Sequence, residues 1–429
     1  MVYGGFGLGR LSSGQVILVP CALPGETLIV TIQQQKKNHL FGEITEILTA
    51  HPLRISPLCP HRQCGGCNLH HTTYHNQLAI KEEMLTDLLR RQMDDKLAAE
   101  ISATREAILP SPNEFGYRQR IRLRVQNGKM GFRGRSSHSL VGITVCNLAK
   151  ERLNQALCQL HNEPETSQLL AAASDIELLE DPVTEKVVLL LHLLRPPRPV
   201  ERKQARAIAE KIPLISRVFF TGRKFALEGP YPQQPADKRL SYQYDIAGHP
   251  LRFGFEVGCF CQVNLDQNEK LIALVCAMAD VQQKEKILDL YCGVGNFALP
   301  LAACGADVFG IEGQGGSIRS ARENADNAGL SSSFIKSPVE SACRQLAAEK
   351  KRFDTVIIDP PRRGIPQLAE PLTKLTIKKL IYISCDPATM MRDLRALCRM
   401  GFTVTAFQPV DMFPQTHHIE SVVCLTKER

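Results

Sequence analysis

The sequence lacks any hydrophobic run long enough to cross a membrane. Its longest aliphatic run is Val187–Leu191, whereas a transmembrane helix needs about 20 apolar residues. Residues 1–10 contain no apolar segment of the signal-peptide type, and no internal repeat or low-complexity tract stands out. We therefore expect a cytoplasmic protein that has no membrane partner and acts as a monomer.

The sequence also lacks a strong excess of one charge. Its formal net charge is +8 and its pI is about 8.8, which favours an anionic partner slightly and suits an ordinary basic enzyme equally well. Hydrophobic residues make up 44 % of the 429 residues, enough for two or three globular domains. The 15 cysteines do not indicate disulfides in a chain without an export signal. A cysteine cluster in a reducing compartment indicates a metal site or a catalytic site.

The stretch Lys286–Glu312 reads as strand, glycine turn, helix and strand. The turn contains Gly293 and Gly295, the helical pattern begins at Asn296, and the second strand pattern ends at Glu312. Such glycines let the backbone approach a nucleotide-type cofactor, and the acidic residue suits a ribose diol. Dinucleotides and S-adenosylmethionine both bind to turns of this kind. A glycine turn that only packs a helix against a sheet is the alternative.

Strand and helix patterns alternate regularly from residue 251 onward. This alternation predicts an α/β fold: a doubly wound, mostly parallel sheet covered on both faces, with ligands at the carboxyl ends of its strands. The predicted strands are Lys286–Leu290, Asp307–Ile311, Ser333–Lys336, Thr355–Asp359 and Leu380–Ser384, and the predicted helices include Ser317–Ala328 and Met390–Met400.

One of these strands ends at Asp359, which two prolines follow. An acidic residue and two prolines at this place resemble the fourth motif of S-adenosylmethionine-dependent methyltransferases. Enzymes that methylate amino groups usually have an aromatic residue next, and here it is Arg362, which argues against that reaction. A simple turn at the end of a strand is the alternative.

The next strand ends directly before Cys385, and Glu420 precedes the last apolar strand pattern. A thiol at a strand end would face the cofactor. The positive end of the helix that follows would favour the thiolate, whereas the adjacent Asp386 would oppose it. A buried structural cysteine and a surface glutamate are the alternatives to a nucleophile and a catalytic carboxylate.

Three cysteines, Cys59, Cys64 and Cys67, lie within nine residues and are joined by two glycines. Glycine permits the backbone turns that let three thiolates converge on one centre. Iron–sulfur clusters and structural zinc both use such thiolates, and the spacing does not decide between them. We expect Cys146 as the fourth ligand. The alternatives are Cys158, His61, His70 and His71.

The first 50 residues predict a small β-barrel of the oligonucleotide-binding kind, with strands at Val16–Pro20, Thr27–Ile32 and Gly42–Leu48. Further along, four arginines alternate with aliphatic residues, which places the guanidinium groups on one face of a strand. Nucleic-acid phosphates would balance these charges; neutralisation by local carboxylates is the alternative. The arginines are Arg118, Arg120, Arg122 and Arg124.

Taken together, these motifs resemble those of the RNA (uracil-5-)-methyltransferases, which make 5-methyluridine through a cysteine adduct. The resemblance covers nearly the whole chain and is closest to the members that act on 23S ribosomal RNA. It implies a class I methyltransferase domain, an N-terminal RNA-binding β-barrel of the OB type, and a central α+β domain that carries a [4Fe–4S] cluster. The matching motifs are YGGFGLGR, CPHRQCGGC, FCQVN, LDLYCGVGNF, DPPRRG, SCDPATMMRDL and THHIESV.

The resemblance also implies roles for individual residues. Cys385 matches the nucleophile and Glu420 matches the general base. The positions that match contacts to S-adenosylmethionine or to the reacting base are Gln262, Tyr291, Gly293, Asn296, Glu312 and Asp359. The positions that match the cluster ligands are Cys59, Cys64, Cys67 and Cys146.

Three features depart from the family pattern. Only four residues separate Cys59 from Cys64, one fewer than the family usually has. Cys261 stands where an aromatic residue is common, which predicts weaker stacking on the base. The chain begins inside the first strand of the barrel, with Tyr3 almost at its start, which predicts either a shortened barrel or a true start upstream of residue 1.

These observations predict methylation of uridine C5 in ribosomal RNA, with transfer RNA as the second choice of substrate. A nicotinamide-dependent oxidoreductase would use the glycine turn but would leave Asp359 and Cys385 without a role. A non-catalytic RNA-binding protein would need only the barrel and the arginine strand. The predicted domains are residues 1–50 (barrel), 51–250 (central domain) and 251–429 (methyltransferase domain).

Overall fold

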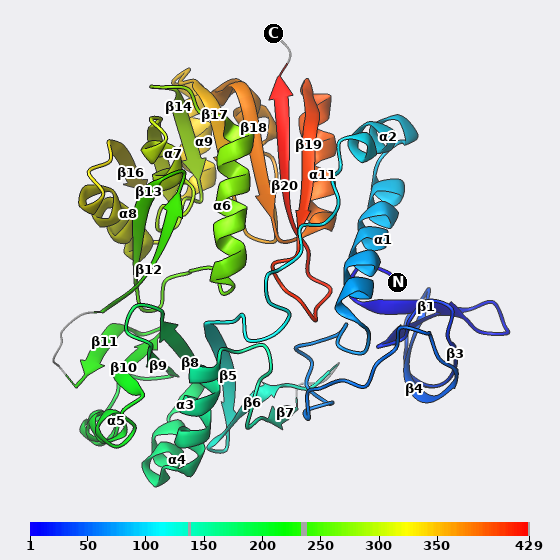
Figure 1. Cartoon of the computed structure of the whole chain (residues 1–429), viewed down its shortest axis with the longest axis vertical. Coiled ribbons are helices and arrows are strands. Elements are labelled where there is room, and N and C mark those ends of the chain that lie inside the picture. The colour runs from blue at the N-terminus through cyan, green and yellow to red at the C-terminus, as the bar shows by residue number, and fades with distance from the viewer. Residues whose placement is uncertain (136–138, 233–237, 428–429) are drawn as a thin grey trace.

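The protein is described by a computed structural model that covers residues 1–135, 139–232 and 238–427. The C-terminal third contains a seven-stranded sheet of order β16-β15-β14-β17-β18-β20-β19 (Figure 1). Strands β14 to β18 pair in parallel, and β20 runs antiparallel to both of its neighbours. The predicted mostly parallel sheet is confirmed. Its strands are β14 (Lys286–Leu290), β15 (Asp307–Glu312), β16 (Ser332–Lys336), β17 (Phe353–Ile358), β18 (Thr376–Ser384), β19 (Phe402–Val410) and β20 (Glu420–Lys427).

Helices cover both faces of this sheet, because alternate strand residues point to opposite sides. Ile287 and Ile357 belong to an apolar cluster with α6, α7 and α8. Leu288 and Val356 belong to a second cluster with α9, α10 and α11. These helices are α6 (Leu265–Ala279), α7 (Ala298–Ala303), α8 (Gly315–Asn327), α9 (Val339–Ala348), α10 (Ala369–Leu375) and α11 (Pro387–Arg399).

Two helices from far earlier in the chain complete the second layer. Helix α1 (Tyr74–Gln92) buries Ile80, Met84 and Leu88, which share one helix face, in the cluster that contains Leu288. Helix α2 (Asp95–Ala103) adds Ile101 to the same cluster. Figure 1 shows α1 and α2 beside β19 and α11. Residues numbered within the predicted central domain therefore pack on the C-terminal sheet.

The central part of the chain forms a second seven-stranded sheet, of order β11-β10-β9-β8-β5-β6-β7. Helices α3, α4 and α5 pack against it in a separate apolar cluster. The strands are β5 (Arg120–Gln126), β6 (Lys129–Arg133), β7 (Leu140–Gly142), β8 (Ala173–Asp181), β9 (Lys186–Leu193), β10 (Ile215–Gly222) and β11 (Phe225–Tyr231). The helices are α3 (Glu151–Asn162), α4 (Pro164–Leu170) and α5 (Pro199–Lys211).

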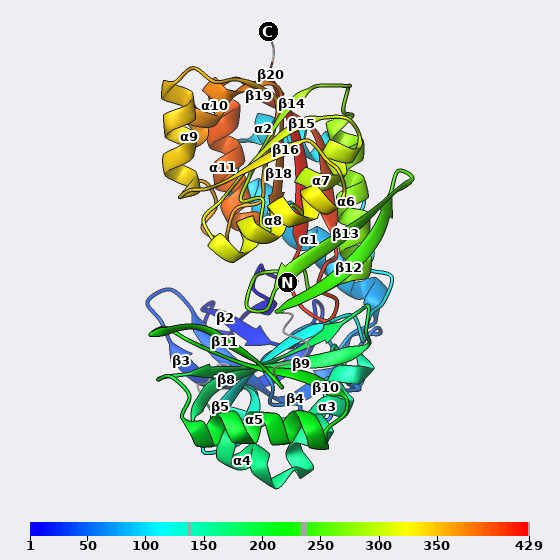
Figure 2. The same ribbon diagram turned by 90° about the vertical axis from the view of Figure 1, so that its left-hand side faces the viewer.

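A β-hairpin joins the two large sheets. Its strands, β12 (Arg239–Ile246) and β13 (His249–Glu256), pair with each other, and their apolar residues belong to the same cluster as α6 and α7. Figure 2 shows the hairpin extending from the central part towards the C-terminal sheet. The predicted boundary at residue 250 falls inside this hairpin, so the domain limits stay a prediction.

The N-terminal residues form a four-stranded sheet of order β1-β2-β4-β3 around a small apolar cluster. Its strands are β1 (Phe6–Arg10), β2 (Val16–Pro20), β3 (Thr27–Gln35) and β4 (Leu40–Thr49). The three strands predicted here are confirmed. Among the described residues, no helix is both long and apolar enough to span a membrane.

Candidate active site

The glycine turn lies between β14 and α7, at the carboxyl edge of the C-terminal sheet. Gly293 and Gly295 have φ angles of 56° and 92°, which glycine adopts without steric cost. Tyr291, directly before the turn, also has a positive φ angle, 64°. A Cβ atom at Gly293 would meet nothing within 4 Å, so the backbone is open to a ligand there. The Gly293 amide donates to Glu312 Oε2 at 3.3 Å, and the Gln314 amide donates to Glu312 Oε1 at 2.7 Å. The turn and Glu312, the last residue of β15, therefore form one unit.

Buried carboxylates surround this turn. Asp359 follows β17, and burial together with the nearby Glu312 raises its pKa to about 7. Burial and the charge of Asp359 also raise the pKa of Asp289, which lies within β14. Carboxylates this close repel one another unless a ligand supplies donors or positive charge. S-adenosylmethionine carries ribose hydroxyls and a cationic sulfonium, so these residues fit it.

Two further predicted cofactor residues are held by neighbouring side chains. The Asn296 and Asn268 amides exchange hydrogen bonds of 2.9 and 3.0 Å, and the Tyr242 hydroxyl donates to Asn296 at 3.3 Å. The Tyr291 hydroxyl donates to Glu340 at 3.3 Å.

Gln262 is almost completely buried between β13 and α6, with 9 % of its surface exposed. The neighbouring Cys261, at the place where the family commonly has an aromatic residue, is also buried.

The antiparallel pairing of β18 with β20 places Cys385 beside Glu420. Ser384 and Ser421 are Cα partners, and Cys385 and Glu420 are the next residues at that end of the two strands. Burial raises the pKa of the Cys385 thiol most, and the nearby Glu420 and Asp359 carboxylates raise it further. Burial and then Asp359 raise the pKa of Glu420 well above its usual value. The nucleophile and the carboxylate predicted from sequence are therefore brought together, with Asp359, at one sheet edge.

Of the two opposing effects expected at Cys385, the one that disfavours the thiolate prevails in the protein on its own. The pKa of the Cys385 thiol is raised to about 12, because burial and the carboxylates of Glu420, Asp359 and Asp386 outweigh the nearby Arg362 and the helix end. The helix that follows is capped by Asp386, whose side chain accepts from the Thr389 amide at 2.9 Å, so part of its positive end is already satisfied.

Sequence reasoning missed Tyr3, which comes from the N-terminal segment. Burial raises the pKa of its hydroxyl, and the nearby charges of Asp386 and Cys385 raise it further. Its ring meets His417 edge to face, with centroids 5.7 Å apart. No local pattern marks a residue so distant in sequence, so only the fold reveals it.

The four cysteines predicted as metal ligands line one cavity of about 1090 Å³. Burial and the neighbouring Cys146 and Cys64 raise the pKa of Cys67 to about 12, and Cys59 raises the pKa of Cys146 and Cys64. The thiols are thus near neighbours. Within the described ranges, no set of three or more histidine, cysteine or acidic side chains has metal-binding geometry.

Carboxylates of a neighbouring strand in the central sheet neutralise the charges of three arginines on β5. Strand β8 lies beside β5, and Arg120 donates to its Glu177 at 2.6 Å. Arg122 and Arg124 lie 3.5 and 3.4 Å from Asp175. The local-carboxylate alternative is therefore confirmed for these three arginines, and their mutual repulsion gives no reason to expect a polyanion. Arg118 instead lies over the ring of Phe413 and lines the cysteine cavity.

Comparison with known proteins finds matches along the chain. Residues 73–428 match the family model described as tRNA (Uracil-5-)-methyltransferase, and residues 3–45 match that of the TRAM domain. An "Uncharacterized RNA methyltransferase" of Thermotoga maritima is 30 % identical, over 100 % of this chain and 97 % of its own. The 23S rRNA (uracil(1939)-C(5))-methyltransferase RlmD of Shewanella sediminis is 32 % identical, over 95 % and 90 %.

Among solved structures, the tRNA (uracil-54, C5)-methyltransferase of Pyrococcus abyssi, in complex with S-adenosyl-L-homocysteine, superposes with a TM-score of 0.72. The match covers 98 % of this chain and 100 % of that one at 24 % identity, so this similarity concerns the fold.

Proposed function

Since this chain belongs to the tRNA (uracil-5-)-methyltransferase family, we propose that it methylates a uridine of 23S ribosomal RNA through a covalent adduct with Cys385. The chain is an S-adenosylmethionine-dependent RNA (uracil-5-)-methyltransferase. The observation that carries the proposed mechanism is the register of Ser384 with Ser421, because it sets a thiol beside a carboxylate next to the glycine turn.

The chemistry explains why a thiol is needed. Carbon C5 of uracil is a poor nucleophile, and addition of the Cys385 thiolate to C6 gives C5 carbanion character. S-adenosylmethionine would supply an electrophilic methyl group: C5 would bond to that carbon as the bond between the carbon and the sulfonium sulfur breaks, with the neutral thioether S-adenosylhomocysteine as the leaving group. Glu420 then removes the C5 proton as general base. The bond between C6 and the cysteine sulfur breaks, and the aromatic ring is restored.

The raised pKa values suit these roles. A carboxylate whose pKa lies well above its usual value, as that of Glu420 does, is a stronger base towards a carbon acid once it has lost its own proton. The Cys385 thiol must lose its proton when the substrates bind, because its pKa in the protein alone is about 12. The target uridine must leave its stack to reach a buried thiol, so an unpaired loop uridine fits better than a paired one.

We assign the cofactor to the edge described above. Gly293 would approach it through backbone atoms and Glu312 would accept from its ribose. The remaining proposed contacts to the cofactor or to the base are Gln262, Tyr291, Asn296 and Asp359. The support for Tyr291 and Asp359 is their position directly after β14 and β17, near the unbalanced carboxylate of Asp289. Asn296 belongs to the glycine turn, and Gln262 is assigned from the resemblance of its motif alone.

We also propose a [4Fe–4S] cluster on Cys59, Cys64, Cys67 and Cys146. The support is that the four thiols line one cavity and act on one another's pKa. Its role would be structural, since the methylation requires no electron. We further propose that the protein works in the cytoplasm as a monomer, and that residues 1–50, 51–250 and 251–429 are its barrel, central and methyltransferase domains.

Transfer RNA is the second candidate substrate, because the matching family model and the superposed structure are both described by transfer RNA. One experiment separates the two. Ribosomal and transfer RNA from cells with and without this protein are digested and mapped by mass spectrometry. We expect one uridine of 23S RNA to lose the mass of a methylene group in cells without the protein. A mass change found only in transfer RNA would show that transfer RNA, and not 23S RNA, is the substrate.

A further inference from the structure

A nine-residue loop leads directly into the proposed general base. It consists of residues 411–419, between the end of β19 and Glu420, the first residue of β20. We call it the base-carrying loop. None of its residues is exposed, which is unusual because connecting segments normally run over the surface. Its polar backbone groups must therefore find partners inside the protein.

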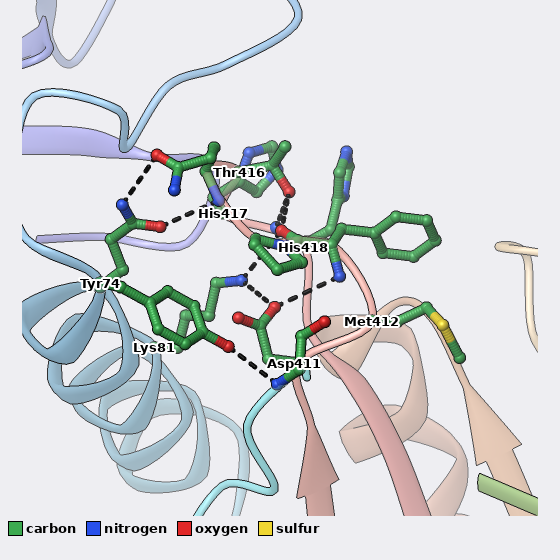
Figure 3. Close-up of polar contacts among 12 residues, drawn as sticks. Tyr74, Lys81, Asp411, Met412, Thr416, His417 and His418 are labelled. Carbon is green, nitrogen blue, oxygen red and sulfur yellow. Dashed lines mark hydrogen bonds and ion pairs between the residues drawn. The ribbon is translucent and has the colours of Figure 1, made fainter. Parts of the chain in front are cut away.

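The loop is anchored at its start by an ion pair with helix α1. Lys81 Nζ donates to Asp411 Oδ1 at 2.6 Å and to the Phe413 carbonyl at 3.2 Å (Figure 3). The Phe413 amide donates back to Asp411 Oδ1 at 3.2 Å. Both side chains of the pair are 0 % exposed. One ammonium group thus fixes two residues of the loop at a set distance from α1.

The middle and end of the loop are held in the same way. Gln77, one turn before Lys81 on α1, donates to the Gln415 side chain at 2.9 Å and accepts from the Gln415 amide at 2.9 Å. Asn68 accepts from the His417 amide at 2.8 Å. The hydrogen-bond partners of the loop therefore come from Asn68, which follows Cys67, and from α1. Both lie more than 300 residues earlier in the chain.

Stability alone does not explain a buried ion pair at this place. Desolvation of two charges offsets most of their attraction, and apolar residues of similar size often serve a core equally well. What an ion pair adds is a fixed geometry, because the ammonium must meet one carboxylate and one carbonyl at hydrogen-bond distance. The geometry fixed here is that of the base-carrying loop, whose flanking residues, Val410 and Glu420, are Cα partners in β19 and β20.

We propose that Lys81 and Asp411 are positioning residues that hold Glu420 in place for removal of the C5 proton. This inference rests on the proposed function, in which Cys385 forms the adduct and Glu420 resolves it. It assigns the pair to one step of the reaction. Cys385 lies at the end of β18, outside the base-carrying loop, so loss of the pair should affect adduct formation much less than removal of the C5 proton.

The test follows formation and release of the adduct separately. Two variants remove the pair: Lys81→Met, and the double variant Lys81→Met with Asp411→Asn, which leaves no uncompensated charge in the core. Arg91→Met is the matched control, because Arg91 lies on the same helix in an exposed pair with Asp87. The substrate is 23S RNA from cells that lack this protein. Circular dichroism and thermal melting check that each variant is folded.

Adduct formation alone is measured with the same RNA transcribed with 5-fluorouridine, whose C5 has no proton to remove. We expect both pair variants to form this adduct at a rate within about threefold of wild type. With ordinary RNA we expect release to slow by at least tenfold, so that a protein–RNA complex stable in detergent accumulates while KM changes little. Arg91→Met should match wild type in both steps.

Release at the wild-type rate by a folded pair variant would overturn the inference. Slowed adduct formation on fluorinated RNA would also overturn it, because the defect would then not be specific to proton removal. If neither pair variant folds, the pair is a stability element and the inference fails as well. Absence of any adduct with the wild-type protein would instead refute the proposed function, so the two failures are distinguishable.

Discussion

Ser384 of β18 and Ser421 of β20 face each other as antiparallel partners, and this pairing decides which side chains meet at the end of the sheet. A shift of one residue would turn Glu420 to the other face, because side chains alternate along a strand. With the observed register, Cys385 and Glu420 act on one another and on Asp359. The predictions below follow from that arrangement.

Replacement of the thiol should abolish methylation. We expect Cys385→Ala to lower the turnover of RNA by roughly 10⁴-fold or more, because without the adduct C5 has no carbanion character. Binding of RNA should stay within about twofold of wild type. Transfer of a labelled methyl group and a filter-binding assay measure the two quantities. Cys158→Ala, at an exposed cysteine, is the control, and full activity of Cys385→Ala would refute the covalent mechanism.

The reactivity of Cys385 in the protein without substrates should be low and should depend on its carboxylate neighbours. Its pKa of about 12 means that alkylation by iodoacetamide keeps rising with pH above 9, where an ordinary thiol levels off. In Asp359→Asn one of the charges that raise this pKa is removed, because Asp359, with a pKa of about 7, is ionised at about pH 8, so the same peptide should react several-fold faster there. Mass spectrometry of the digested protein reads both results. A plateau below pH 9 would contradict this prediction.

Removal of the charge of Asp359 should stabilise the protein and weaken cofactor binding. Its folded pKa, about 7, lies above the ordinary value of 3.8, so ionisation costs stability as pH rises from 3.8 through 7. We expect Asp359→Asn to raise the melting temperature by roughly 2 to 6 °C at pH 8, with little change near pH 4. Binding of S-adenosylmethionine should weaken at least tenfold.

The exposed Asp326 of α8 offers a matched control for this stability test. Asp326→Asn should leave both the melting temperature and the cofactor affinity unchanged. A melting temperature of Asp359→Asn below that of wild type at pH 8 would show that the carboxylate is already paired in the protein and would contradict the prediction.

Protein purified without oxygen should be brown and should contain iron. We expect about four iron atoms per chain and an absorbance band in the visible blue, both lost in Cys64→Ala and kept in Cys158→Ala. Elemental analysis and absorbance measure this. One zinc atom per chain without iron would contradict the cluster and would show that the cysteines hold a structural zinc ion.

Much of the C-terminal fold could be predicted because its signals are local. The apolar run Lys286–Leu290 is β14 with the predicted bounds, and the glycine turn after it lies beside Glu312 as the spacing indicated. Each feature depends on residues close together in the chain. Their periodicity and turn residues are enough to place them.

What could not be predicted depends on partners distant in the chain. The pattern of Arg122 and Arg124 was visible, but the carboxylate of Asp175 that neutralises them lies on another strand. Helix α1 has an apolar face, yet nothing in its sequence states that Lys81 meets Asp411, 330 positions away. The approach of Tyr3 to the active site is of the same kind.

The central claim is that a uracil ring is bonded to Cys385 during the reaction. The most direct test is to incubate the wild-type protein with S-adenosylmethionine and 5-fluorouridine-substituted 23S RNA, digest the complex, and sequence the modified peptide by mass spectrometry. The account predicts one cross-linked peptide, with a methylated fluorouridine nucleotide on Cys385. A complex that never forms, or a nucleotide attached to any other residue, would contradict it.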